Sequence, residues 1–383
     1  MQKNELADIK KKNKIKKTSK LLLFLFVLLV IFLLFWNFKN AIIHIFNSIS
    51  IEYEEMKNGA KFPRQLKGEV PVKLEDFGSN LLLISEDNVA VYSASNAAKL
   101  FDVVHSAQDG DLKHNGKKII TYTYEGGNIN VYNRLAKISG EQNKKTIYDI
   151  EVANDGKVAV LSSSPHYASN VKVRDNENKQ IFEWNWAGNY ALTAAFSKNS
   201  QNIAIVTLGS FEGVPRSRVN VFEISSNKLK YSFDTEDTIY YLSYISSDKI
   251  VLITDSNVCF LNSKLELVEK FPFGGEKLEK FACNDEFVVL CFEGYGIDNS
   301  WNVVALDGSG QKLGTNRISS SEIKSVKCSK EYIGILADKN IFLFNKRLEK
   351  VKTYDCNVPI YDFVCIGNTM FVVNEKELCK IGI

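Results

Sequence analysis

One short pattern recurs through most of this 383-residue chain. An apolar run of about five residues is followed by a turn and a second apolar run, which usually opens with Asn before Val or Ile. The second runs begin at Asn88, Asn128, Asn170, Arg218, Asn257, Asn302, Asn340 and Leu378. Successive starts are 38 to 48 residues apart. A four-stranded propeller blade takes about 40–45 residues, whereas a sandwich or an up-and-down barrel has no reason to repeat at that period.

The repeat therefore predicts an all-β fold, a β-propeller. Eight hairpins predict eight blades, and a seven-bladed ring with an overlapping closure is the alternative, because the outer strands near Val70 and Asp102 are hard to place. Asn at the start of the second strand suits a turn, since its side chain caps nearby backbone and tolerates left-handed geometry. We interpret these Asn residues as turn residues rather than ligands.

The N-terminal region has a different character. Residues 1–20 contain eight Lys against one Glu and one Asp, and Leu21–Trp36 then runs without a polar residue. A helix crosses a bilayer with roughly 20 apolar residues, and a signal-peptide core has only about 7–15. Lysines before the helix favour a cytoplasmic N-terminus. The pattern predicts one uncleaved transmembrane signal-anchor helix in the lipid bilayer, with a cleavable signal peptide and a buried core helix as alternatives.

Four segments follow from this. We expect a basic cytoplasmic tail at 1–20, a transmembrane helix at 21–45, a polar juxtamembrane stalk at 46–67 and an extracytoplasmic propeller at 68–383. After residue 20 the chain holds 40 basic and 43 acidic residues. This balance argues against nucleic-acid binding, which needs a basic surface.

No catalytic or metal-binding motif is present, and no cofactor is expected. There is no G-x-S-x-G, H-E-x-x-H, Walker loop or EF-hand sequence. The seven cysteines all lie in the last third of the chain, and their spacing is too wide for a zinc site. The odd count favours packed free thiols, with one or two disulfides between neighbouring blades as the alternative. Carboxylates such as Asp149 and Glu151 are interpreted as turn-associated rather than catalytic.

Loop length provides the candidate binding residues. Three hairpins have long connections, at SSPHYAS, at GSFEGVPRS (209–217) and at EGYGIDNSW (293–301), and equivalent loops of a propeller open on one face. The candidate ligand-binding residues in them are His166, Tyr167, Phe211, Arg216, Tyr295 and Trp301. Neutral variation in loop length is the alternative interpretation. Trp184 and Trp186 are expected to pack against the next blade rather than to stack on sugars.

The repeats LLLISEDNVAVYSA, KKIITYTYEGGNINVYN and TIYDIEVANDGKVAVLSSS resemble those of the WD40-like and quinoprotein-like propeller group. The Gly-His and Trp-Asp signatures of WD40 blades are missing from the blade ends. With the lysine-rich tail and the apolar segment, the chain resembles, over roughly residues 10–383, an uncharacterised family of N-terminally membrane-anchored propellers of Gram-positive bacteria. The resemblance implies a fold and a cell-membrane location, and no activity.

Two classes of function remain. The leading hypothesis is a non-enzymatic scaffold or sensor at the cell surface, which binds a protein, a peptide or a cell-wall glycan on the long-loop face. The alternative is a propeller enzyme, a hydrolase, lyase or quinoprotein-like oxidoreductase that uses the central channel. A polar channel with perturbed carboxylates or a metal favours the enzyme, and an apolar, plugged channel favours the scaffold.

Overall fold

The protein is described from a computed structural model. It describes residues 23–32, 43, 46–47, 49–105, 110–142, 144–294 and 299–383. The chain divides into two compact units, Met1–Glu54 and Glu55–Ile383. The second unit contains all of the β-strands found in the described residues.

The N-terminal unit is helical where it is described. Residues 23–32 form one helix, and a second covers 49–57, within the predicted stalk. Across the described ranges, no helix combines the length and the apolar character that a membrane crossing requires. The predicted tail at 1–20, and most of the predicted span at 21–45, lie outside the described residues.

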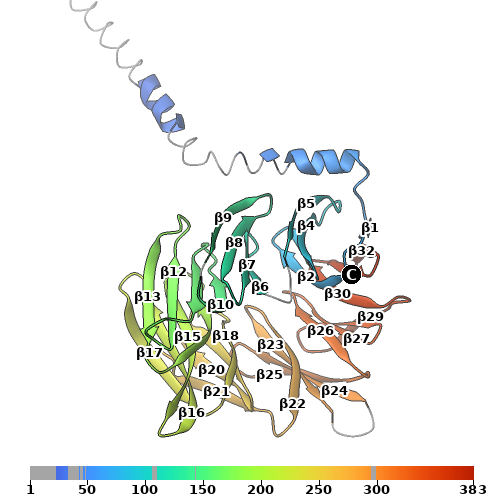
Figure 1. Ribbon diagram of the computed structural model, residues 1–383. Coiled ribbons are helices and arrows are strands. Elements are labelled where there is room, and N and C mark those ends of the chain that lie inside the picture. Colours follow the sequence, from blue (N-terminus) through green and yellow to red (C-terminus); the bar gives the residue numbers. More distant parts are fainter. Residues whose placement is uncertain are drawn as a thin grey trace, which may run out of the picture. The chain divides into compact units, whose positions relative to one another are not determined.

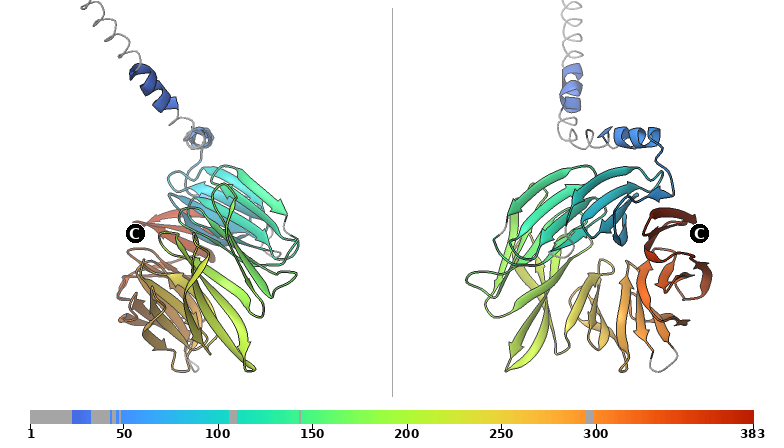
Figure 2. Two further views of the ribbon diagram at one scale, coloured as in Figure 1. Left: turned by 90° about the vertical axis from the view of Figure 1, so that its left-hand side faces the viewer. Right: turned by 45° about the vertical axis from the view of Figure 1, so that its right-hand side comes forward.

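The second unit consists of eight four-stranded antiparallel sheets that follow one another around a ring in chain order (Figures 1 and 2). The first four blades contain β2 (Pro71–Phe77), β3 (Asn80–Ser85), β4 (Asn88–Ser93) and β5 (Lys99–Val104); β6 (Gly110–His114), β7 (Lys118–Thr123), β8 (Asn128–Asn133) and β9 (Lys137–Gln142); β10 (Ile147–Val152), β11 (Val158–Ser162), β12 (Ser169–Arg174) and β13 (Gln180–Trp186); and β14 (Tyr190–Phe196), β15 (Asn202–Phe211), β16 (Val214–Glu223) and β17 (Lys228–Thr235). The last four contain β18 (Ile239–Tyr244), β19 (Lys249–Thr254), β20 (Asn257–Asn262) and β21 (Leu267–Pro272); β22 (Lys277–Cys283), β23 (Phe287–Glu293), β24 (Ser300–Asp307) and β25 (Lys312–Ser319); β26 (Ile323–Cys328), β27 (Ile333–Ala337), β28 (Asn340–Phe344) and β29 (Lys350–Asp355); and β30 (Ile360–Ile366), β31 (Thr369–Asn374) and β32 (Glu377–Gly382), joined by β1 (Arg64–Gln65). The prediction of an eight-bladed propeller is confirmed.

Burial follows the position of a strand within its blade. The second and third strands, such as β19 and β20, are buried on both faces because neighbouring blades cover them. The outermost strands, such as β29, are largely exposed. First strands of neighbouring blades contact one another at the centre of the ring, as β10 does with β6 and β14. They line the central channel, and their side chains are more often polar.

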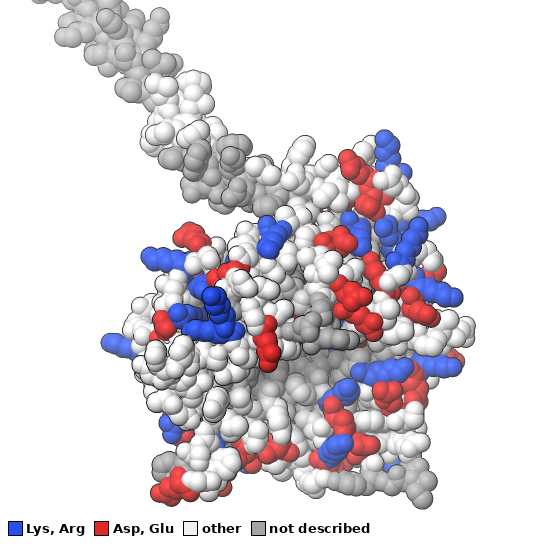
Figure 3. Space-filling model, viewed as in Figure 1, with Lys and Arg blue, Asp and Glu red and all other residues white. Residues whose placement is uncertain are grey.

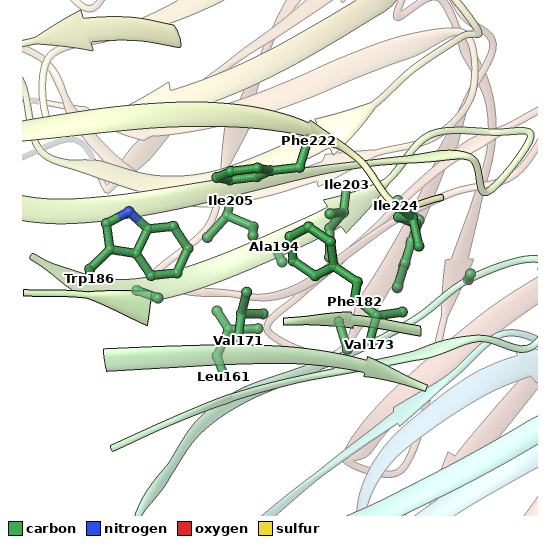
Figure 4. Close-up of a cluster of buried hydrophobic side chains, with 14 residues drawn as sticks. Leu161, Val171, Val173, Phe182, Trp186, Ala194, Ile203, Ile205, Phe222 and Ile224 are labelled. Carbon is green, nitrogen blue, oxygen red and sulfur yellow. The ribbon is translucent and has the colours of Figure 1, made fainter. Parts of the chain in front are cut away.

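Neighbouring blades are held together by apolar side chains that interlock between the sheets. Between the third and fourth blades, Phe182 and Trp186 from β13 face Phe222 from β16 (Figure 4). The rings of Trp184 and Phe222 have centroids 4.7 Å apart. The prediction that Trp184 and Trp186 pack against the next blade is confirmed.

The ring closes through the two ends of the propeller sequence. β1 pairs with β32 and becomes the outermost strand of the eighth blade. The propeller therefore begins before the expected boundary at residue 68, because β1 lies within the predicted stalk. On the channel side, Asp362 of the eighth blade accepts a 2.9 Å hydrogen bond from the backbone N–H of Leu74 in the first blade. Lys327 lies 3.0 Å from the same carboxylate.

All seven cysteines are free thiols in the structure. Cys259 and Cys291 are buried, and the other five are half-buried. Burial raises the pKa of Cys259 to about 11 and that of Cys291 to about 12. These thiols act as small apolar side chains within the blades.

Candidate functional site

The two faces of the propeller are defined by its topology. Because strands alternate in direction, the loops between second and third strands open on the same face as the loops that join one blade to the next. We call this the hairpin face. The loops between first and second strands, and between third and fourth strands, form the opposite face.

Exposed apolar side chains in the loops are found on the hairpin face. In the described part of the propeller, every exposed large hydrophobic residue outside the outermost strands lies in a loop or at a strand end of this face. They are Val70, Val72, Tyr124, Tyr167, Tyr190, Val214, Tyr240, Val358 and Tyr361. The described loops of the opposite face contain none. Five of these nine are tyrosines, a residue type enriched where proteins bind partners.

A repeated backbone irregularity places several of these side chains. In seven of the eight blades the pairing of the first strand with the second slips by one residue, close to the start of the first strand. The extra residues are Val72, Tyr148, Leu192, Tyr240, Glu279, Lys324 and Tyr361. A bulge leaves its residue unpaired and redirects the side chain. Tyr240, 65% exposed, thus stands at the channel mouth on the hairpin face.

The tyrosines are concentrated on one side of the ring. Four of the five exposed tyrosines lie in neighbouring blades: Tyr124 in the second, Tyr167 in the third, Tyr190 in the fourth and Tyr240 in the fifth, whereas Tyr361 lies in the eighth. The four neighbouring blades are consecutive, so their four tyrosines form an arc, which we call the tyrosine arc. Tyr124, Tyr190 and Tyr240 were not among the residues predicted from the sequence. For Tyr240 the available signal was the recurrent Ile-Tyr at the start of first strands, in IYDI, IYYL and IYDF.

The two faces also differ in charge. In the described loops of the hairpin face the acidic residues are Glu69, Glu86, Asp87, Glu125, Glu212, Glu236, Asp237, Asp255, Glu276, Glu322, Asp338 and Glu375, and the basic ones are Lys67, Lys144, Lys145, Lys339 and Lys376. The described loops of the opposite face hold equal numbers: Asp155, Asp175, Glu177, Asp248, Glu266, Asp285, Glu286, Glu331 and Glu349 against Lys117, Arg134, Lys157, Lys179, Lys198, Lys264, Lys330, Lys346 and Arg347. On the side of the molecule seen in Figure 3, both signs are interspersed. The hairpin face carries an acidic excess that the opposite face lacks.

The structure places the predicted loop residues in three different settings. His166 and Tyr167 are exposed in the loop between β11 and β12, as expected. Tyr295 lies outside the described residues. Arg216 lies in β16, where it pairs with Glu236 at 3.1 Å. Phe211 ends β15, and its side chain is not among the described ones.

The expected long loop at 209–217 is wrong. β15 and β16 continue as one hairpin, paired from Asn202↔Glu223 out to Phe211↔Val214. Only Glu212 and Gly213 form the turn, and both have positive φ, 51° and 82°. Two such residues make a tight hairpin turn whose twist matches that of the strands, so the ladder continues past Pro215.

Trp301 is also not a loop residue. It lies in β24, is only 7% exposed and packs in the cluster between the sixth and seventh blades. Its indole N–H donates a 3.1 Å hydrogen bond to the backbone oxygen of Ser320. The expectation that Trp301 is presented in an exposed loop is therefore wrong, because the strand pairing begins at Ser300.

The central channel is polar beside the tyrosine arc. Asp149 on β10 pairs with Lys113 at 3.1 Å and accepts a 2.8 Å hydrogen bond from the hydroxyl of Thr193. The hydroxyl of Tyr122 lies 3.5 Å from the same carboxylate. These contacts join the second, third and fourth blades through one buried carboxylate. Asp149 thus stabilises the ring and is fully engaged in doing so.

Glu151, two residues further along β10, lines a cavity of about 310 Å³ together with Lys113, Thr193 and Tyr241. Burial raises the pKa of Glu151 to about 8, against the opposing charge of Lys113 and with the repulsion of Asp149. Near neutral pH this carboxyl group is mostly protonated and so acts as a hydrogen-bond donor. In the described residues no group of three or more His, Cys, Asp or Glu is placed to hold a metal ion.

Comparison with known proteins identifies the family and the fold. Residues 50–383 match the model of a family described as a family of unknown function, DUF5711. Curated proteins gave no match to the sequence. The C-terminal WD40 domain of Sif2 is similar in structure, with 12% identity, a TM-score of 0.57 and coverage of 85% of this chain and 99% of that one.

Two further structures have the same architecture. Sqt1 of Chaetomium thermophilum, bound to the N-terminus of the ribosomal protein L10, shares 10% identity with a TM-score of 0.57, over 83% of this chain and 98% of its own. BamB of Moraxella catarrhalis shares 11% identity with a TM-score of 0.52, over 83% of this chain and 99% of its own. At these identities the likeness establishes a WD40-like propeller fold.

Proposed function

We propose that this chain, which belongs to the DUF5711 family of unknown function, is a binding module that holds a segment of a partner protein or peptide on its hairpin face. The observation that carries the proposal is the tyrosine arc. Exposed tyrosines supply large contact areas and lose little conformational freedom on binding, because each has only two side-chain torsions. Their grouping on one face, with none exposed in the described loops of the other, is typical of a binding surface.

The channel mouth supports a peptide or protein partner over a flat glycan surface. Tyr240 of the arc lines the channel cavity together with Tyr241, and the cavity continues to Asn154 and Lys198 in loops of the opposite face. A cavity with aromatic side chains beside it suits a segment whose side chains enter it. The C. thermophilum Sqt1 structure, a propeller bound to the N-terminus of another protein, offers a fold-level analogy only.

The test is selection of random dodecapeptides on phage against the full-length chain. Selected peptides are expected to lose about 30-fold in affinity on Tyr190→Ala and on Tyr240→Ala, because truncating a hot-spot tyrosine costs about 2 kcal/mol. The matched control is Leu229→Ala, an apolar residue that is 46% exposed on the outermost strand β17, which should change affinity less than twofold. Equal binding to all three variants would place the site elsewhere. If the chain sedimented with purified cell-wall sacculi and bound no peptide, the partner would be a glycan rather than a peptide.

A membrane tether and a location outside the cytoplasm are part of the proposal. The support is the apolar run Leu21–Trp36, preceded by eight lysines. In intact cells, a membrane-impermeant thiol reagent should label a cysteine introduced at Ser50 above the level of the native chain, and should not label one introduced at Ser19. The reverse pattern would contradict the orientation, and labelling of neither would contradict exposure at the surface.

An enzyme that uses the channel is a second candidate, favoured by Glu151. A carboxyl group with a raised pKa beside a cavity is a suitable general acid. Asp149, the nearest second carboxylate along β10, is occupied by Lys113 and Thr193, which argues against a catalytic pair. Turnover of nitrophenyl glycosides or esters that Glu151→Gln abolishes, at unchanged thermal stability, would favour the enzyme over the binding module.

A further inference from the structure

The loops around the tyrosine arc carry mostly acidic residues. Glu125, Glu212 and Asp255 are exposed and lie in the second, fourth and fifth blades, the same blades that carry the arc. Glu236 joins them, although it pairs with Arg216. In the described loops between and within these blades, the basic side chains on the hairpin face are Lys144 and Lys145.

This arrangement combines two features that attract cations. Carboxylates grouped on one face produce a negative potential that draws positively charged ligands to that face. The faces of tyrosine rings also attract ammonium and guanidinium groups, by about 0.5–2 kcal/mol depending on solvent exposure. The carboxylates of these loops would repel an anionic ligand or an acidic segment.

We propose that the segment held on the hairpin face is basic: an extended, Lys- or Arg-rich stretch of a partner polypeptide that lies across the tyrosine arc. The proposal rests on the proposed function and adds the chemistry of the partner. The partner's cationic side chains contact the tyrosine rings, and the surrounding carboxylates neutralise their charge. The opposite face, whose described loops carry acidic and basic residues in equal number, offers no such preference.

The experiment measures fluorescence anisotropy of two labelled dodecapeptides, one of alternating Lys and Ser and one of alternating Glu and Ser, with the full-length chain. The Lys peptide should bind, and the Glu peptide should bind at least about tenfold more weakly, because like charges across an interface are strongly disfavoured. Affinity for the Lys peptide should fall as salt is raised, since exposed charges are screened.

Two triple variants localise the effect. Neutralisation on the hairpin face, by Glu125→Gln, Glu212→Gln and Asp255→Asn, should weaken the Lys peptide about fivefold or more. Neutralisation on the opposite face, by Glu177→Gln, Asp248→Asn and Glu266→Gln, removes the same net charge and should change affinity less than about twofold. Equal losses in both variants would show attraction to net charge alone and would overturn the proposal.

The test of the basic partner can fail while the test of the binding module succeeds. Phage-selected peptides that depend on Tyr190 and Tyr240, but are not basic and bind the hairpin-face triple variant as well as the native chain, would refute the basic partner and leave the binding module intact. Peptides that ignore the tyrosines would refute both. Selected peptides rich in Lys and Arg, sensitive to both sets of variants, support both.

Discussion

The two faces of this propeller are made by the same eight sheets, and yet their loops carry different side chains. The opposite face is closed by polar turns with balanced charge, and its turn residues Leu265 and Leu348 are buried. The hairpin face exposes tyrosines and carries an acidic excess. Turns on both faces have the same structural task, which is to reverse the chain between strands. The difference in loop side chains is therefore not required by the fold, and we attribute it to binding on the hairpin face.

The largest expected effect comes from opening the closed ring of blades, on which both faces depend. Deletion of residues 371–383 removes β32, the partner of β1, and buried residues such as Phe371 and Leu378. Each blade buries its surfaces only against its neighbours, so an open ring exposes two blade faces to water. Cooperative unfolding in urea should be lost, and with it peptide binding. A truncated chain that unfolds like the intact one would contradict the closed ring.

A smaller loss of stability is expected when the buried side chain of Trp301, near the hairpin face, is removed. Trp301→Ala removes a buried indole and leaves the backbone oxygen of Ser320 without its donor. Large-to-small substitutions of this kind cost about 3–5 kcal/mol of unfolding free energy. Urea denaturation measures the change, and Trp301→Phe, which keeps most of the volume, should cost less. An unchanged urea midpoint for Trp301→Ala would mean that the side chain is exposed after all.

The stability of the fold should depend on pH through a carboxyl group of the channel, which lies between the two faces. The pKa of Glu151 is raised to about 8 in the folded state, above the unfolded value of 4.5. The folded state therefore binds this proton more tightly, and stability should decrease as the pH rises between those two values, by up to about 1.4 kcal/mol for each pH unit. Glu151→Gln should flatten this dependence and leave peptide binding unchanged. Urea midpoints at pH 6, 7, 8 and 9 test it, and parallel curves for both proteins would contradict the raised pKa.

The smallest effect on stability is expected for Tyr167→Ala. The side chain is 46% exposed in the loop after β11, and changes at such positions usually shift unfolding free energy by less than about 0.5 kcal/mol. Binding of selected peptides should nevertheless weaken, because Tyr167 belongs to the tyrosine arc. His166→Ala is the neighbouring control without loss of a tyrosine ring. Full binding by Tyr167→Ala would limit the site to the tyrosines at the channel mouth.

The regular part of the fold could be predicted from the sequence because it is local. Second and third strands are buried on both faces, so runs such as KIVLIT and NVCFLN are visible in any window. β1 could not be found in this way. It has only two residues, Arg64 and Gln65, neither of them apolar, and it is a strand only because β32 pairs with it.

The site was harder to predict for related reasons. The second strand of the fourth-blade hairpin was expected to begin at Arg218, but pairing across the Glu212–Gly213 turn extends both strands through 209–217. Trp301 was assigned to a loop because its strand was expected to begin at Asn302, and its burial depends on residues of the seventh blade. The bulge tyrosines lie within strands, where apolar alternation suggests packing. The exposure of Tyr240 and Tyr361 depends on a one-residue slip in pairing that hydrophobicity does not encode.

Because β1 pairs with β32, the ring of blades can close only after the last strand has been synthesised. Gln65 and Glu377, which pair across these strands and join by their side chains, are 312 residues apart. Contacts between such distant parts of a chain form late and slow the overall folding rate. During synthesis, β1 emerges first and must wait, without its partner, until the final blade has followed it. An incomplete propeller is therefore a sheet array with two open ends, and the period before closure is when this protein is most exposed to misassembly and proteolysis.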